Sequence, residues 1–273
     1  MISIDQIFNN QYYKKSNWIY LLIPFSIIFY CISISKNYLY KNGFLKRIKI
    51  KVPVLIIGNI TLGGTGKTPL ALNLITKFLN EGLNPALISR GYGGSAKNIT
   101  EVHEFSNARS VGDEALLIKA KSKIPVFIGK NRVNVAKILL KKYPKTSIII
   151  SDDGLQHHRL ARDYEIIVVD SKRKFGNGFI FPAGPLRESR SRLNLVDAVV
   201  YKGSINNSKF YQMKYITKHF ENLVTSKKIL FEGIQDKKIV AITAIGNPES
   251  FFSTLEGYNL EFTKVIFHDH YFF

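Results

Sequence analysis

The residues with the clearest chemical potential form a glycine-rich run, TLGGTGKT at positions 61–68, directly after the apolar stretch VLIIG. Its glycines would let backbone amides converge on phosphate groups, and Lys67 would bring a positive charge to the β and γ oxygens of a nucleotide. The hydroxyl of Thr68 is suited to ligating magnesium. An apolar strand, a glycine-rich turn and a helix beginning near Pro69 form the context of a P-loop, although the consensus places glycine where this chain has Thr61. The predicted ATP-binding loop consists of Thr61, Leu62, Gly63, Gly64, Thr65, Gly66, Lys67 and Thr68.

Two adjacent carboxylates, Asp152 and Asp153, follow the apolar pattern TSIII. P-loop enzymes hold Mg²⁺ with a carboxylate at this place, directly or through water. The chain continues as GLQHH, and paired histidines beside paired aspartates leave a transition-metal site as an alternative. Magnesium is favoured because the phosphate loop is present and the sole cysteine, Cys31, cannot form a cysteine-based zinc site.

A kinase that acts on an alcohol needs a carboxylate, alone or held by a histidine, to accept the hydroxyl proton. Asp113 opens a predicted helix in the run SVGDE, where helix capping alone would also explain an acidic residue. The remaining candidates are the pair Asp269 and His270, and Asp170, which is expected to be structural at a strand end.

Arginines gather in the run PLRESRSR, which follows GNGFIFPAG. Arg187 could neutralise charge on a transferring phosphoryl group. Arg190 and Arg192 fit a solvated or membrane-facing basic patch equally well. A second flexible run, SRGYGG at positions 89–94, brings the ring of Tyr92 to another strand end.

Short β-branched runs alternate with helical segments after position 52, which is typical of a parallel α/β sheet. Strands are expected at 52–58, 84–90, 124–129, 146–153, 164–170 and 196–203, with helices at 68–81, 112–121 and 130–142. Further strands are expected at 209–217, 227–233 and 237–245, followed by a helix at 248–256. The predicted fold is a P-loop NTPase-like, mostly parallel, doubly wound sheet, in which ligands bind at the carboxyl ends of strands. The predicted domains are an N-terminal membrane-associated region (1–51), a P-loop kinase core (52–204) and a smaller α/β lobe (205–273).

Residues 18–35 carry no charge, and this length is close to the roughly 20 residues that cross a bilayer core. Lysines and arginines are more frequent after this run than before it, which predicts a main domain in the cytoplasm. A buried core helix and an in-plane hairpin bent at Pro24 are the alternatives. The net charge of +19 favours phosphates, nucleic acid or an anionic membrane surface, and equally reflects a lysine-rich composition.

Taken together, the motifs GNITLGGTGKTP, SRGYGG, SVGDEALL, SDDGLQHHRL, GNGFIFPAGPLRES and HDHY resemble those of tetraacyldisaccharide 4′-kinase, the lipid A kinase of Gram-negative bacteria. The resemblance covers most of the chain and keeps the motif order. It implies transfer of the ATP γ-phosphate to the 4′-hydroxyl of a lipid A disaccharide 1-phosphate at the cytoplasmic face of the inner membrane. The implied cofactors are ATP and Mg²⁺, and neither a nucleic acid nor an obligate protein partner is expected.

The same resemblance assigns roles to particular residues. Asp113 looks like the catalytic base, assisted by His270, and Tyr92 looks like a residue near the nucleotide. Around the phosphates, Lys67 and Arg187 are the expected cations, with Glu188 beside them. The magnesium set implied by the motifs is Thr68, Asp152, Asp153, Glu114 and Gln156, with His157 nearby.

Family members normally continue well past the Asp-His pair, whereas this sequence ends at Phe273, so an incomplete C-terminal lobe is expected. The main alternative function is a membrane-associated P-loop ATPase that acts on a protein partner or inserts a metal. A basic nucleic-acid-binding protein is a third, weaker alternative, because no aromatic and basic reading motif supports it.

Overall fold

The computed structural model describes residues 12–13, 17–205, 208–217, 219–234, 237–245, 248–267 and 271. The chain divides into two compact units, one of residues Phe8–Met213 and one that contains Lys214–Phe273. The last strand of the large sheet ends at Met213, so this boundary lies after the end of the core that the sequence predicted at position 204.

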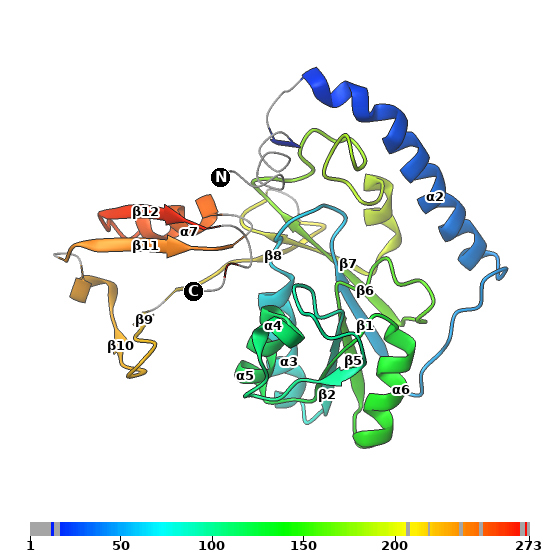
Figure 1. Cartoon of the computed structure of the whole chain (residues 1–273), viewed down its shortest axis with the longest axis horizontal. Helices are drawn as coiled ribbons and strands as arrows, with labels where there is room; N and C mark the ends of the chain where they lie inside the picture. The colour runs from blue at the N-terminus through cyan, green and yellow to red at the C-terminus, as the bar shows by residue number, and fades with distance from the viewer. Residues whose placement is uncertain are drawn as a thin grey trace. The chain divides into compact units, whose positions relative to one another are not determined.

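An eight-stranded sheet forms the centre of the larger unit, with strand order β3-β4-β2-β5-β1-β6-β7-β8 (Figure 1). Every neighbouring pair is parallel except β3 and β4, which are antiparallel. The strands are β1 (Val54–Gly58), β2 (Pro85–Ser89), β3 (Thr100–Glu101), β4 (Val126–Ile128), β5 (Ile148–Asp152), β6 (Tyr164–Asp170), β7 (Ala198–Lys202) and β8 (Tyr211–Met213). Because Ile57 is in register with Asp152, the carboxyl ends of β1 and β5 meet at one edge. The predicted parallel α/β fold is confirmed.

Helices cover both faces of this sheet (Figure 1). They are α3 (Lys67–Asn80), α4 (Ala108–Val111), α5 (Asp113–Ser122) and α6 (Arg132–Lys142). Successive side chains of a strand point to opposite faces. Leu55 and Ile57 of β1 therefore join the core under α3 and α5, whereas Ile56 joins the core under α6. A strand that is apolar on both faces is buried only when helices cover both sides of the sheet. This three-layer arrangement leaves the ends of the strands uncovered.

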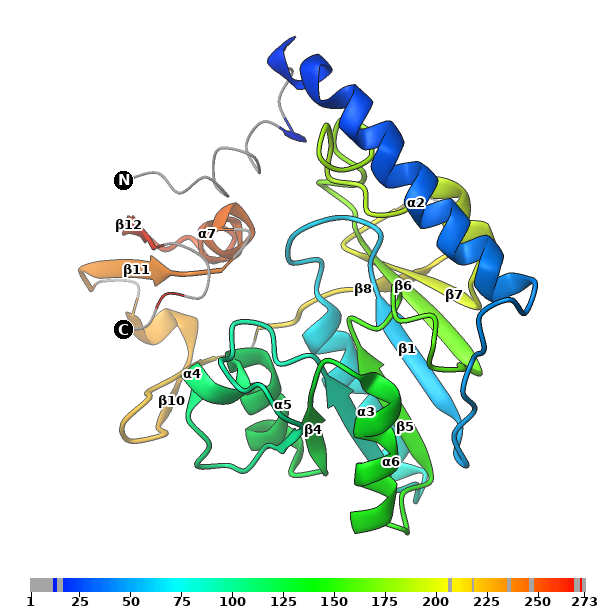
Figure 2. The ribbon, with the colours of Figure 1, turned by 45° about the vertical axis from the view of Figure 1, so that its right-hand side comes forward.

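The N-terminal apolar segment forms a 3₁₀ turn, η1 (Asn17–Leu22), and a helix, α2 (Ile23–Lys41). Pro24 lies in the first turn of α2, where its missing N–H costs nothing, so the proline starts the helix and does not bend it. Figure 2 shows α2 beside the yellow-green segment that precedes β7. The Ser26 hydroxyl accepts a hydrogen bond from the backbone N–H of Ala183 at 2.9 Å, and the two groups are buried.

The smaller unit contains two short sheets. An antiparallel pair joins β9 (Phe220–Glu221) to β10 (Lys228–Ile229), and a parallel pair joins β11 (Ile239–Thr243) to β12 (Phe262–Ile266). The remaining elements are η3 (Phe231–Ile234) and α7 (Pro248–Glu256) in this unit, and η2 (Arg190–Leu195) in the larger one. Phe252 of α7 is fully buried in a small aromatic and aliphatic core.

Candidate active site

The glycine-rich loop connects β1 to α3, as the sequence predicts. Gly63 and Gly66 have φ values of 92° and 96°, a backbone conformation that residues with a side chain rarely adopt. The loop is tied to the segment before η2, because Leu62 N–H donates to Pro185 O at 2.8 Å and Arg187 N–H donates to Ile60 O at 2.7 Å. These bonds hold Arg187 beside the phosphate loop, although the two are far apart in the sequence.

Lys67 and Arg187 converge on a single carboxylate, that of Asp153. Lys67 Nζ lies 3.5 Å from Asp153 Oδ1, and Arg187 Nη1 lies 3.3 Å from Asp153 Oδ2. Burial acts to raise the pKa of Asp153, but the charges of Lys67 and Arg187 outweigh it and hold the pKa below its usual range. Asp153 is therefore ionised and balances two cations at the mouth of the loop.

Asp152 is the last residue of β5 and is 1% exposed. Burial raises the pKa of its carboxyl, and the charge of Lys67 opposes this rise. Its backbone carbonyl accepts a hydrogen bond from Arg132 Nη2 at 3.2 Å, while Arg132 Nη1 donates to Gly129 O at 2.7 Å. Burial lowers the pKa of Arg132 to about 10, and the arginine stays charged.

Arg132 is a residue that sequence reasoning missed. It is 2% exposed and fixes the ends of β4 and β5 at the edge where the phosphate loop opens. An arginine that opens a helix just after a buried apolar strand, in the run IGKNR, was the signal that could have identified it.

The residues present fit a magnesium ion. Thr68 is the second residue of α3, directly after Lys67, and the carboxylates of Asp152 and Asp153 supply the hard oxygen donors that Mg²⁺ prefers. In the described part of the chain, the buried hydroxyls of Thr65 and Ser151 have no hydrogen-bond partner. No cluster of three or more His, Cys, Asp or Glu side chains occurs among the described residues, so these residues do not assemble the donor set of a zinc site. Mg²⁺ keeps waters and phosphate oxygens as ligands and needs fewer protein donors.

Gln156 and Glu188 contact each other, with Gln156 Nε2 donating to Glu188 Oε1 at 2.8 Å. The neighbouring imidazoles are neutral at neutral pH. Burial, with the charge of Arg132 second, lowers the pKa of His157 to about 4, and burial followed by Arg162 lowers that of His158 to about 3.

Asp113 is the first residue of α5, and its carboxylate accepts a hydrogen bond from the N–H of Glu114 at 2.8 Å. The preceding Gly112 has a φ of 87°, and a Cβ there would lie 2.5 Å from the carbonyl of Tyr92. Ser95 N–H also donates to Arg109 O at 2.9 Å. The structure thus places the loop that carries Tyr92 beside the turn that carries Asp113 and Glu114. The Tyr92 side chain is 66% exposed.

Three further candidates from the sequence are Asp170, Asp269 and His270. Asp170 Oδ1 accepts from the N–H groups of Lys172 and Arg173 at 2.9 and 3.0 Å, which fits its expected structural role. Asp269 and His270 lie outside the described residues.

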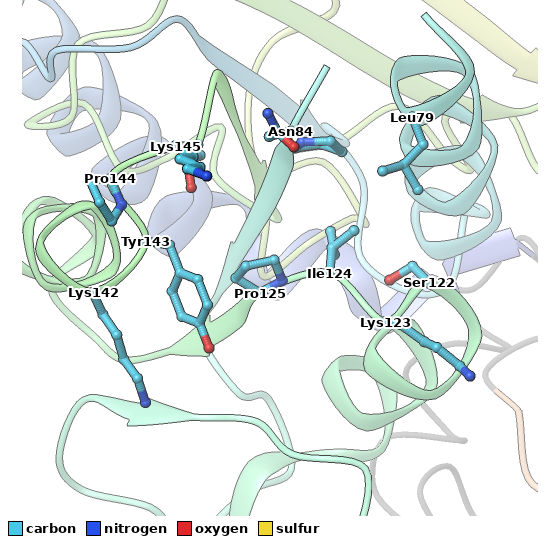
Figure 3. A pocket seen from close by; sticks show the side chains of 12 residues that line it. Leu79, Asn84, Ser122, Lys123, Ile124, Pro125, Lys142, Tyr143, Pro144 and Lys145 are labelled. Carbon is cyan, nitrogen blue, oxygen red and sulfur yellow. The ribbon is translucent and has the colours of Figure 1, made fainter. Parts of the chain in front are cut away.

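A cavity of about 440 Å³ lies at the opposite edge of the sheet (Figure 3). Pro85, which begins β2, lines it together with Pro125 and Tyr143. The amino ends of parallel strands face away from their carboxyl ends, so this cavity is not part of the phosphate site.

The chain is similar to known proteins of one family. The sequence profile of the family described as tetraacyldisaccharide-1-P 4′-kinase (LpxK) matches residues 18–273. The tetraacyldisaccharide 4′-kinase of Methylobacillus flagellatus is 38% identical over 270 residues, which cover 98% of this chain and 81% of that protein. The protein of the same name from Shewanella woodyi is 41% identical over 259 residues, covering 94% and 74%.

Among solved structures, the crystal structure of LpxK from Aquifex aeolicus in complex with ATP superposes with a TM-score of 0.78 at 27% identity. The match covers 93% of this chain and 83% of that one. Sequence and fold agree, and the chain belongs to the tetraacyldisaccharide-1-P 4′-kinase family.

Proposed function

We propose that the chain transfers the γ-phosphate of ATP to the 4′-hydroxyl of tetraacyldisaccharide 1-phosphate, a step of lipid A biosynthesis. The observation that carries the proposal is the pair of cations, Lys67 and Arg187, on either side of the Asp153 carboxylate at the phosphate loop. The identity of the acceptor substrate is inferred from family membership, because the relatives are named for this disaccharide.

ATP binds with its β- and γ-phosphates in the loop of residues 61–68. The backbone amides of this loop and the N-terminus of α3 face the phosphate oxygens, and Lys67 adds a point charge. Tyr92 contributes an exposed ring beside the nucleotide.

Thr68, Asp152 and Asp153 would hold magnesium, with Glu114 and Gln156 as outer donors. Mg²⁺, when bound, neutralises charge on the β and γ oxygens. Gln156 is held by Glu188 at 2.8 Å, which leaves its amide oxygen available to orient a water.

Asp113 accepts the proton of the 4′-hydroxyl as the sugar oxygen bonds to the γ-phosphorus. The bond from that phosphorus to the β–γ bridging oxygen breaks, and ADP leaves with the electron pair. Arg187 stabilises the charge on the transferring group, and His270 assists Asp113 in holding the proton. The position of Asp113 at the start of α5, beside the Tyr92 loop, supports this role.

Helix α2 attaches the chain to the cytoplasmic face of the inner membrane and lies in the membrane plane. Its outward side chains Phe25, Ile28 and Ile32 are 58–63% exposed. The helix is long and apolar enough to span a membrane. However, two aromatic contacts join this segment to the rest of the larger unit, Tyr20 of η1 with Phe179 and Tyr40 of α2 with His158, which favours a helix lying on the surface.

Vesicle sedimentation tests the attachment. Changing Phe25, Ile28 and Ile32 to serine should lower binding to anionic vesicles, since each buried apolar side chain contributes about 1.5–3 kcal/mol. Leu223→Ser with Val224→Ser, at residues that are 98% and 93% exposed, removes apolar surface elsewhere and is the control. Equal loss of binding in the control would contradict a special role for α2.

The activity is tested by transfer of labelled γ-phosphate from ATP to detergent-solubilised tetraacyldisaccharide 1-phosphate. Labelled lipid with the wild type, and none with Lys67→Ala, is the expected result. Hydrolysis of ATP without labelled lipid would overturn the kinase proposal in favour of an ATPase.

A further inference from the structure

A group of buried charges connects the start of β6 to the candidate active site. The carboxylate of Glu165 accepts hydrogen bonds from two arginines, Arg162 Nη1 at 2.7 Å on one oxygen and Arg192 Nη2 at 2.5 Å on the other. The three side chains are only 7–15% exposed. A single carboxylate therefore orients and neutralises two arginines that are shielded from water.

Arg162 extends this group to the loop that follows Asp153. Its Nη1 donates to Leu155 O at 3.0 Å, and its Nη2 donates to His157 O at 2.7 Å. These two carbonyls flank Gln156. Arg162 thus fixes the backbone on both sides of a residue proposed to act at the phosphates.

Arg192 extends the group in the second direction. Its Nε lies 3.3 Å from Glu188 Oε2, as an ion pair without hydrogen-bond alignment. The other oxygen of Glu188 accepts from Gln156 Nε2 at 2.8 Å. Glu188 directly follows Arg187, so Arg192 acts on the segment that carries the cation next to Asp153.

We propose that Glu165 is a positioning residue for phosphoryl transfer, which holds Gln156 and Glu188 in place through Arg162 and Arg192. The proposal rests on the proposed kinase function. Glu165 itself is fixed by its backbone, because its N–H donates to Asp197 Oδ2 at 2.7 Å. The two arginines that Glu165 holds act on the two partners of the Gln156–Glu188 hydrogen bond. Loss of the Glu165 charge therefore releases both partners together.

Glu165→Gln tests the proposal, because it keeps the size of the side chain and removes its charge. We expect kcat per folded molecule to fall about 10- to 100-fold, the range typical of residues that hold site residues in place without contacting the substrate. The KM for ATP should change little. Glu101→Gln is the matched control. The Glu101 side chain is 9% exposed and bonds to Lys142 and Tyr143 at the cavity edge of the sheet, away from the phosphates. The control should change stability and leave kcat unaltered.

A double variant separates positioning from a purely structural role. If Glu165 acts through Arg192, Glu165→Gln combined with Arg192→Gln should lower kcat no further than the more damaging single change. If the loss of kcat in the double variant equals the product of the two single losses, the residues act independently and the proposal is overturned. An unchanged kcat in folded Glu165→Gln would also overturn it.

Hydrogen–deuterium exchange of residues 154–160 gives a readout without lipid. We expect faster exchange there in Glu165→Gln than in the wild type, and no change in Glu101→Gln. If the wild type hydrolyses ATP without labelling lipid, the proposed kinase function is wrong. The role of Glu165 is then still tested by comparing the ATP hydrolysis rates and the hydrogen–deuterium exchange of the same variants. Unchanged exchange and unchanged turnover would reject it.

Discussion

Asp153 has a left-handed backbone (φ 47°) and lies between Lys67 and Arg187. Two cations held close together in a partly buried site repel each other unless an anion lies between them. Asp153 supplies that anion in the structure. Phosphate oxygens bring the same charge, so under the proposed function we expect Lys67 and Arg187 to exchange a carboxylate partner for a phosphate partner when ATP binds.

Asp113 is a residue whose role can be isolated by a small change. Asp113→Asn should lower kcat about 10²- to 10⁴-fold, because general base catalysis contributes in that range. ATP affinity should be unaltered, since the base acts on the acceptor hydroxyl. Turnover assays and nucleotide titrations measure the two quantities. Glu104→Gln, at an exposed residue, is the control, and a matching loss of ATP affinity would contradict the role.

His158 makes stability depend on pH. Burial, followed by the charge of Arg162, lowers the pKa of His158 from 6.5 to about 3, so the unfolded chain binds more protons between these values. The contribution of His158 to the unfolding free energy should therefore fall as the pH drops below 6.5, by at most about 1.4 kcal/mol per pH unit, and His157, with its pKa lowered to about 4, adds to the slope in the same direction. His158→Gln should flatten this slope in urea titrations between pH 7 and pH 5. The exposed His103→Gln should not, and equal slopes in all three proteins would refute the assignment.

At the scale of elements, α2 is attached to the larger unit by few polar contacts, and the buried one at Ser26 is the most informative. Ala183 N–H donates to the Ser26 hydroxyl at 2.9 Å, and this hydroxyl donates to Leu22 O at 3.2 Å. Lys36 Nζ also donates to Gln156 O at 3.4 Å at an exposed position. Aromatic pairs, such as Phe29 with Phe181 at 5.6 Å between ring centroids, supply further contact. The helix is thus oriented by one buried hydrogen bond within an apolar contact.

Ser26→Val should destabilise the larger unit by about 1–3 kcal/mol, because it leaves the buried N–H of Ala183 without a partner. Ser35→Val makes the same chemical change at an exposed position of α2 and should cost little. Urea-induced unfolding of both variants measures the difference. If both lose the same stability, the hydrogen bond contributes nothing particular.

At the scale of the whole molecule, the phosphate loop, α3, β5 and Asp113 all belong to the unit of residues Phe8–Met213. The smaller unit has its own core around Phe252. This division predicts that nucleotide binding and phosphoryl transfer are separable.

A chain cut after Met213 should retain ATP binding and lose transfer to lipid, because it keeps Lys67 and Arg187 but lacks His270. Isothermal titration with ATP and the labelled-lipid assay measure the two activities. Lys67→Ala in the shortened chain is the control for specific binding. Loss of ATP binding in a folded shortened chain would show that the smaller unit completes the nucleotide site.

The sequence by itself determined the features that are local along the chain. The apolar runs predicted every strand of the large sheet except the two-residue β3. The glycines and Lys67 predicted the loop between β1 and α3, and the uncharged N-terminal run predicted a helix. These follow from residue periodicity and backbone freedom, which act over a few positions.

Only the tertiary structure decided which distant charges meet. Arg187 reaches Asp153 across 34 positions, and Arg192 reaches Glu165 across 27. Such pairs depend on strand order and on loops crossing one edge of the sheet, which local patterns do not encode. For the same reason Arg132 and Glu165 escaped notice in the sequence: a charged side chain reveals its role only through the partners that folding brings within hydrogen-bond distance.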